Sequence, residues 1–164
     1  MLLVGDANIF MDFAAADLTP ALFRLGHELV VPEVLFHEEL ASRHAHLLEL
    51  GLQLREMSGD QVQRAAVMMA RHLGPSANDI LALTLAVDLK CPLVTGDARL
   101  TAAAKAEGVD LLGTLSLIEQ MVVSGQVSAD AAHDAYDAMR KAGRRLPWEE
   151  VESQLARLQA IRRD

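Results

Sequence analysis

Short runs rich in leucine and β-branched residues alternate with longer segments of helical period along the first two thirds of this chain. Strands are expected at residues 2–4, 28–31, 52–56, 92–95 and 109–112. Helices are expected between them, at residues 9–25, 33–50, 61–73, 78–89 and 100–107. Because each strand is followed by a helix that leads back to the sheet, the alternation predicts an α/β fold. Its parallel sheet carries helices on both faces.

The pattern becomes purely helical after residue 112, with helices expected at 115–124, 129–142 and 148–161. Thr114 and Ser128 are suitable N-caps, and Pro147 suits the first turn of the last helix. We therefore expect a domain over residues 1–127 with a central parallel sheet of about five strands. A helical C-terminal extension, residues 128–164, is expected to pack on the same domain.

The charge and hydropathy of the chain exclude some classes of function. No apolar run approaches the roughly 20 residues that a membrane-spanning helix needs, and no basic segment precedes the apolar start of the chain. We expect a soluble cytoplasmic protein that does not use a membrane. The net charge of −8 opposes a nucleic-acid binder that works by overall charge. If the protein handles nucleic acid, it must do so with local cations.

Two of the expected strands end in glycine followed by aspartate. "LLVGDANIF" delivers Asp6, and "LVTGDARL" delivers Asp97. In an open parallel sheet the usable crevice lies beyond the carboxyl ends of the strands, where the strand order reverses. If the order is 3-2-1-4-5, the two carboxylates face each other there. They would then raise each other's pKa unless a cation neutralised them, and Mg²⁺ or Mn²⁺ accepts carboxylate oxygens from separate elements.

Two neighbouring glutamates are further candidates. Glu38 and Glu39 lie in the segment "VLFHEEL" of the helix expected after the second strand. Glu39 follows Leu35 by four residues and Phe36 by three, so it shares their apolar stripe, whereas Glu38 lies more to the side. An acid on a buried stripe requires a partner. We favour Glu39, and Glu38 stays open as an alternative.

Asp79 stands at the start of the expected helix in "SANDILALTLAVDL". Ser76 or Asn78 could cap this helix, and an acid in the first turn favours the helix dipole. Asp79 can therefore be explained as a simple helix-start acid. The apolar residues that follow it indicate a buried helix, which would begin close to the carboxyl edge of the sheet.

The stretches "GDANIF", "VPEVLFHEEL" and "NDILALTLAVDLKCPLVTGDARL" together resemble a PIN domain, the fold of the VapC-type toxin ribonucleases and their relatives. The resemblance covers most of residues 1–127 and implies a three-layer PIN-like fold. It implies a site for Mg²⁺ or Mn²⁺ made by four acids, which correspond here to Asp6, Glu39, Asp79 and Asp97. It also implies that two polar residues, Asn8 and Thr95, orient the acids or their waters.

The same resemblance implies a metal-dependent endoribonuclease, with RNA as substrate and a possible role as the toxin of a toxin–antitoxin pair. An antitoxin-type protein would then be a partner. A homodimer is also expected, with apolar surface from Leu155, Leu158 and Ile161. The basic residues that we consider for contact with RNA are Arg99, Arg140, Lys141, Arg144 and Arg145.

Two alternatives stay open. A catalytically silent PIN-like domain would bind RNA or protein, and it would have no chemical need for all four acids. A haloacid-dehalogenase-like phosphatase would use Asp6 as a nucleophile, but that class expects a second aspartate two residues later, where this chain has Asn8. The sequence indicates neither the RNA target nor the number of metal ions.

Overall fold

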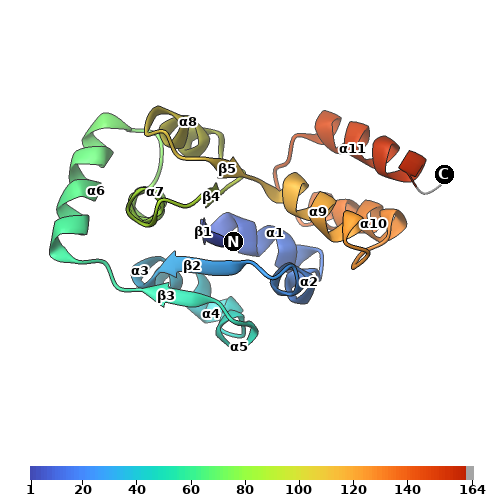
Figure 1. Ribbon diagram of the computed structural model, residues 1–164, viewed down its shortest axis with the longest axis horizontal. Coiled ribbons are helices and arrows are strands. Elements are labelled where there is room, and N and C mark those ends of the chain that lie inside the picture. The colour runs from blue at the N-terminus through green and yellow to red at the C-terminus, as the bar shows by residue number, and fades with distance from the viewer. Residues whose placement is uncertain (162–164) are drawn as a thin grey trace.

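A five-stranded parallel sheet forms the centre of the computed structural model, which describes residues 1–161 (Figure 1). The last three residues of the expected C-terminal extension, 162–164, lie outside this description. The strands are β1 (Leu2–Gly5), β2 (Glu28–Pro32), β3 (Gln53–Arg55), β4 (Leu93–Val94) and β5 (Leu111–Leu112). Their order is β3-β2-β1-β4-β5, so the expected α/β fold and strand order are confirmed.

The register places the middle of β1 between β2 and β4. Val4 is aligned with Val30 of β2 on one side and with Leu93 of β4 on the other. All three side chains are fully buried, as expected for strands that helices cover on both faces. The order of the strands reverses between β1 and β4, so the crevice at their carboxyl ends is the place where a ligand site is expected.

Helices connect every pair of consecutive strands. Those before β3 are short: α1 (Ala7–Ala15), α2 (Thr19–Arg24), α3 (Glu33–Leu35), α4 (Ala41–His44) and α5 (Leu47–Leu50), with a π-helical turn at Phe36–Leu40. Those after β3 are α6 (Gly59–Arg71), α7 (Ala77–Leu89), α8 (Ala98–Ala106), α9 (Thr114–Val123), α10 (Ala129–Lys141) and α11 (Trp148–Ile161).

The helices form layers around the sheet. Helix α7 packs against β1, β2 and β4, and α6 and α8 pack against α7. Helix α1 packs instead against α2, α9 and α10, and α11 packs against α9 and α10. Figure 1 shows α6 and α11 at opposite ends of the molecule. The C-terminal helices therefore extend the layer that begins with α1.

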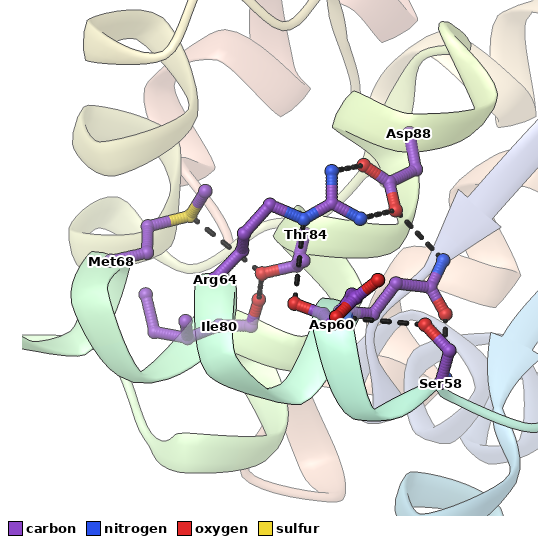
Figure 2. Close-up of polar contacts among 8 residues, drawn as sticks. Ser58, Asp60, Arg64, Met68, Ile80, Thr84 and Asp88 are labelled. Atoms are coloured by element: carbon purple, nitrogen blue, oxygen red, sulfur yellow. Dashed lines mark hydrogen bonds and ion pairs between the residues drawn. The ribbon is translucent and has the colours of Figure 1, made fainter.

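Polar contacts fasten α6 onto α7 (Figure 2). The guanidinium of Arg64 donates to both carboxylate oxygens of Asp88, at 2.7 and 2.6 Å. Gln61 donates to the same carboxylate at 2.8 Å, while its own side-chain oxygen accepts from the backbone of the N-cap, Ser58. One residue thus caps α6 and also ties it to its neighbour.

Two helices that were expected to be continuous are broken. The helix expected at 9–25 ends after α1, where Asp17 adopts a left-handed φ of 57°, and α2 begins with Pro20 in its first turn. The helix expected at 33–50 contains the π-helical turn, in which Ala41 N–H bonds to the carbonyl five residues earlier, at Phe36, and it is interrupted at residues 45–46, between α4 and α5. Both predictions of one long helix are wrong because local backbone geometry interrupts an otherwise helical apolar pattern.

The apolar residues that were expected to offer a dimer surface are mostly used inside the chain. Leu155 and Leu158 are buried, at 5% and 2% exposure, while Ile161 is 64% exposed. The surface expected from all three residues is therefore wrong, because α11 turns its leucines toward the chain itself. Within the described residues, no helix has both the length and the apolar character required to cross a membrane.

Candidate functional site

Asp6 begins the site, at the point where β1 passes into α1. Its side-chain Oδ1 accepts a hydrogen bond from Ile9 N at 2.9 Å, so the residue is the N-cap of α1. Its backbone N–H donates to the carbonyl of Val94 at 3.1 Å, which places it beside the end of β4. Asp6 is fully buried. Local capping therefore explains why a carboxylate follows this strand.

Thr95 connects this acid to the next strand. Its Oγ1 donates to Asp6 Oδ2 at 2.6 Å and accepts from the backbone N–H of Asp97 at 3.0 Å. The threonine is buried, with 5% exposure. One hydroxyl thus fixes the carboxylate of Asp6 and the backbone of Asp97 relative to each other.

Asp97 repeats the role of Asp6 on the other side of the strand reversal. Its Oδ1 accepts from Leu100 N at 2.8 Å, so it is the N-cap of α8. Its side chain is half-buried. The structure therefore brings the segments that carry Asp6 and Asp97 together, and in each case an N-cap stands at the strand-to-helix turn.

Asp79 lies at the start of α7, as expected. It forms a reciprocal capping box with Ser76: Asp79 N donates to Ser76 Oγ and Ser76 N donates to Asp79 Oδ2, both at 3.1 Å. Of the two expected caps, Ser76 is the one used. The carboxylate of Asp79 is half-buried, and its charge acts on Asp6.

The ionisation of Asp6 reflects this environment. Burial raises the pKa of Asp6 from 3.8 to about 7, against the hydrogen bonds from Thr95 and Ile9, which favour the charged form. The negative charges of Asp79 and Asp12 raise it further. An acid with these neighbours is the kind of group that a hard divalent cation would neutralise.

Both glutamates of the π-helical turn are exposed. The expectation that Glu39 lies on a buried stripe is therefore wrong, because the extra residue in the turn changes the helical spacing. Glu38 Oε2 accepts from Asn78 Nδ2 at 2.8 Å. The surrounding protein still raises the pKa of Glu39 by partial burial, and the negative charges of Asp79 and Glu38 add to this effect. The negative charge of Asp79 thus acts on the carboxyl of Glu39.

A cleft of about 740 Å³ opens beside these acids. It is lined by Asn8, Asp12, Gly74, Ser76, Asp79, Gly96, Asp97, Ala98, Arg99, Gly143, Arg144 and Arg145. Its wall therefore combines carboxylates with three arginines. Asp6 is not among the lining residues, and neither glutamate of the π-helical turn lines the cleft.

The chemistry of this donor set suits Mg²⁺ or Mn²⁺, because both ions prefer carboxylate oxygens supplied by separate elements. The convergence of the side chains is less complete. Within residues 1–161, no three histidine, cysteine or acidic side chains gather closely enough to hold a metal ion together. Asp6 and Asp97 are thus connected through the hydroxyl of Thr95, and Asp79 acts on Asp6 through its charge. The acids do not form a complete coordination shell.

Comparison with known proteins gives this arrangement a family. A family model described as a PIN domain matches residues 2–160. The chain belongs to the PIN-domain family. PIN domains are typically nucleases, and they commonly use divalent metal ions. The match runs through α10 and into α11, and the division of the PIN domain at residue 127 stays a prediction.

A solved structure supports the same fold. The chain is similar to a PilT N-terminus domain protein from the hyperthermophilic archaeon Sulfolobus solfataricus P2, with a TM-score of 0.53 and 16% identity. The likeness covers 73% of this chain and 92% of the archaeal one. A search among curated proteins finds no match. At this identity the archaeal structure supports the PIN fold alone.

The basic residues considered for RNA contact fall into two groups in this PIN domain. Arg99, Arg144 and Arg145 line the cleft. Arg140 instead lies 4.3 Å above the ring of Trp148, and it and Lys141 are exposed on α10 outside the lining. The cationic wall of the cleft thus comes from the start of α8 and from the loop after α10.

Sequence reasoning missed Asp12, a buried acid in α1. Its Oδ1 accepts from Arg144 Nε at 2.6 Å, and its Oδ2 accepts from Thr114 Oγ1 at 2.9 Å. The signal was present, because Asp12 is the one acid within the apolar run "NIFMDFAA". We expected Glu39 to be an acid on a buried stripe that requires a partner. Asp12 is the acid that fits this description, because it is buried and has Arg144 and Thr114 as partners.

Proposed function

We propose that this PIN domain is a metal-dependent ribonuclease that hydrolyses RNA phosphodiester bonds at the carboxyl edge of its sheet. The observation that carries the proposal is the environment of Asp6. Its carboxyl is fully buried among other acids, with a pKa raised to about 7, next to a cleft that also presents three arginines. Acids that would hold a cation therefore lie beside cations that would hold phosphate.

Asp6, Asp79, Asp97 and Glu39 would hold Mg²⁺ or Mn²⁺ in this proposal, with Glu38 as the alternative to Glu39. When bound, the ion would activate a water molecule and stabilise negative charge on the phosphate. Because Asp6 is fully buried and the acids do not yet converge, binding of the ion has to be accompanied by movement of side chains. Thr95 and Asn8 would orient the acids.

The substrate, the partners and the location belong to the same proposal. Arg99, Arg144 and Arg145 would contact the RNA backbone in the cleft, and Arg140 and Lys141 would extend this path along α10. A toxin role would require an antitoxin-type protein that occupies the cleft, and pairing of two copies is compatible with such a role. We place the activity in the cytoplasm, where its RNA substrate is present.

A binding module without catalysis is the second candidate, and one observation favours it. Asp6 and Asp97 are N-caps, and Asp79 belongs to a capping box. Each of these three acids therefore has a structural reason to be present. A domain that only binds RNA or protein could keep all three for the stability of its helices.

Cleavage assays separate the two candidates. The full chain is incubated with labelled single-stranded and structured RNA in Mn²⁺, in Mg²⁺ and in EDTA. We expect cleavage that requires the metal and falls by at least about 100-fold in Asp6→Asn and Asp97→Asn. Asp60→Asn serves as the matched control, because Asp60 is an exposed acid in the first turn of α6. If wild type and all three variants bind RNA without cutting it, the binding module is the better account.

A further inference from the structure

Arg144 reaches the cleft from the C-terminal part of the chain, just after α10. Its Nε donates to Asp12 Oδ1 at 2.6 Å, and its Nη2 donates to Asn8 Oδ1 at 3.1 Å. Both acceptors belong to α1, more than 130 residues earlier in the sequence. The loop after α10 is thus fastened to the helix that begins at Asp6.

The partner of this arginine is itself held in place. Asp12 is buried, with its side chain 5% exposed, and Thr114 of α9 donates to its second oxygen. Asp12 therefore cannot turn freely with Arg144. A planar guanidinium bound to this fixed carboxylate on one side and to Asn8 on the other has a defined orientation, and less conformational freedom is lost when it binds an anion.

The guanidinium still has donors to offer. It carries five N–H groups, and the contacts to Asp12 and Asn8 use Nε and Nη2. No acceptor among residues 1–161 bonds to Nη1, and the side chain remains 24% exposed on the wall of the cleft. Arg144 is therefore fixed, yet it can still bind a ligand.

The two other arginines of the cleft are held differently. A Cβ at Gly74 would lie only 3.1 to 3.3 Å from carbons of Arg99, so the stem of Arg99 rests on the backbone there. Arg145 is exposed, and no described residue forms an ion pair with it. Of the three, Arg144 is the arginine whose charged group is oriented by the protein.

We propose that Arg144 is a pre-oriented phosphate contact of the site, and that Asp12 and Asn8 are the residues that position it. The site is then composite, because residues beyond 127 supply the oriented cation while β1, β4 and α7 supply the acids. This inference rests on the proposed function for the identity of the ligand, a phosphodiester of RNA. A purely structural ion pair between α1 and the loop after α10 is the competing account.

Binding of a labelled single-stranded RNA oligonucleotide tests the proposal, measured by fluorescence anisotropy over a series of salt concentrations. EDTA is present, so that no turnover interferes. We expect Arg144→Ala to weaken binding by about 3- to 10-fold. We also expect it to make the negative slope of log affinity against log salt shallower by about 0.7. Arg144→Lys should keep the slope but bind more weakly than wild type, because a lysine lacks the planar fork.

Asp12→Asn distinguishes orientation from charge. Removing a negative charge beside the cleft would strengthen RNA binding if only the total charge mattered. We expect it to weaken binding instead, because Arg144 loses its charged anchor. Arg157→Ala is the matched control: Arg157 is also an ion-paired arginine of the C-terminal part, 3.4 Å from Glu119, and it does not line the cleft.

Three results would overturn the proposal: an Arg144→Ala variant that binds like Arg157→Ala, stronger binding by Asp12→Asn, or a wild type that does not bind RNA even at low salt. Thermal unfolding of each variant shows which ones are folded. If Arg144→Ala does not fold, Arg144→Lys still tests the proposal. A wild type that binds but never cleaves RNA with Mn²⁺ would remove the ribonuclease and leave the role of Arg144 standing.

Discussion

Burial raises the pKa of Asp6 to about 7, so this carboxyl changes its protonation state near neutral pH in the metal-free protein. The unfolded chain releases the same proton near pH 4. Between these two values the folded state holds a proton that the unfolded state has lost. The contribution of Asp6 to stability is therefore fully present below about pH 4 and is lost as the pH rises through about 7.

This gives a prediction for the metal-free protein. In EDTA, the free energy of unfolding of wild type relative to Asp6→Asn should fall between pH 4 and pH 7, by up to about 4 kcal/mol. Above pH 7.5 the difference should be constant. Urea unfolding at several pH values measures it. A difference between the two proteins that does not vary with pH would show that the carboxyl ionises normally.

Asp97 separates capping from charge. Asparagine caps helices about as well as aspartate, so Asp97→Asn should change the free energy of unfolding by only about 0.5 kcal/mol or less. Asp97→Ala should cost about 1 kcal/mol, because Leu100 N loses its acceptor. Urea unfolding of both variants measures this. Equal losses in the two would mean that the charge, and not the cap, stabilises α8.

These acids differ in how far sequence could identify them. The position of Asp6 and Asp97 at the ends of strands could be predicted, but their meeting at one crevice depended on an assumed strand order, which the structure confirms. Asp12 could not be paired from sequence, since its partner Arg144 lies 132 residues away. Glu39 was expected on a buried stripe, but that inference assumed regular helical spacing. The π-helical turn removes this spacing.

At the scale of elements, the parallel arrangement of the strands could be predicted and the continuity of the helices could not. Strand and helix alternation predicts a parallel sheet, whereas the order β3-β2-β1-β4-β5 was an assumption that the structure confirms. The break after α1 lies where Asp17 has a left-handed φ, just before Pro20 in the first turn of α2. A periodic apolar pattern continues across such a break, because buried residues on both sides face the same core.

The contact between α6 and α7 provides a prediction at this scale. Arg64 and Asp88 form a two-pronged ion pair, with the arginine side chain 57% exposed and the aspartate 16% exposed. Because the arginine is largely solvated, we expect a coupling energy of about 0.5 to 1 kcal/mol. A double-mutant cycle of Arg64→Ala and Asp88→Ala by urea unfolding measures it. A coupling energy near zero would mean that the helices are held by apolar packing alone.

The two single variants of this cycle should lose different amounts of free energy of unfolding. Asp88→Ala should cost more than Arg64→Ala, because Asp88 also accepts from Gln61 at 2.8 Å. Gln61 also belongs to the capping box of α6, so the loss of its contact to Asp88 should weaken the start of that helix as well. Equal losses in the two single variants would show that the contact of Gln61 contributes nothing measurable.

At the scale of the whole molecule, the cleft joins parts that are far apart in sequence. Its lining acids come from α1, from the start of α7 and from the segment after β4, and its arginines come from α8 and the loop after α10. The net charge of −8 opposed only a nucleic-acid binder that works by overall charge, because total charge does not report where the cations lie. Only the fold brings Arg99 and Arg144 to the same cleft.

The central claim is that these acids bind a divalent ion, and calorimetric titration of the full chain with Mn²⁺ tests it most directly. We expect saturable binding that weakens by at least about 10-fold in Asp6→Asn and in Asp97→Asn, because both remove a charged ligand. Asp60→Asn should bind as wild type does. Equal Mn²⁺ affinity in wild type and all of these variants, or no binding at all, would contradict the claim.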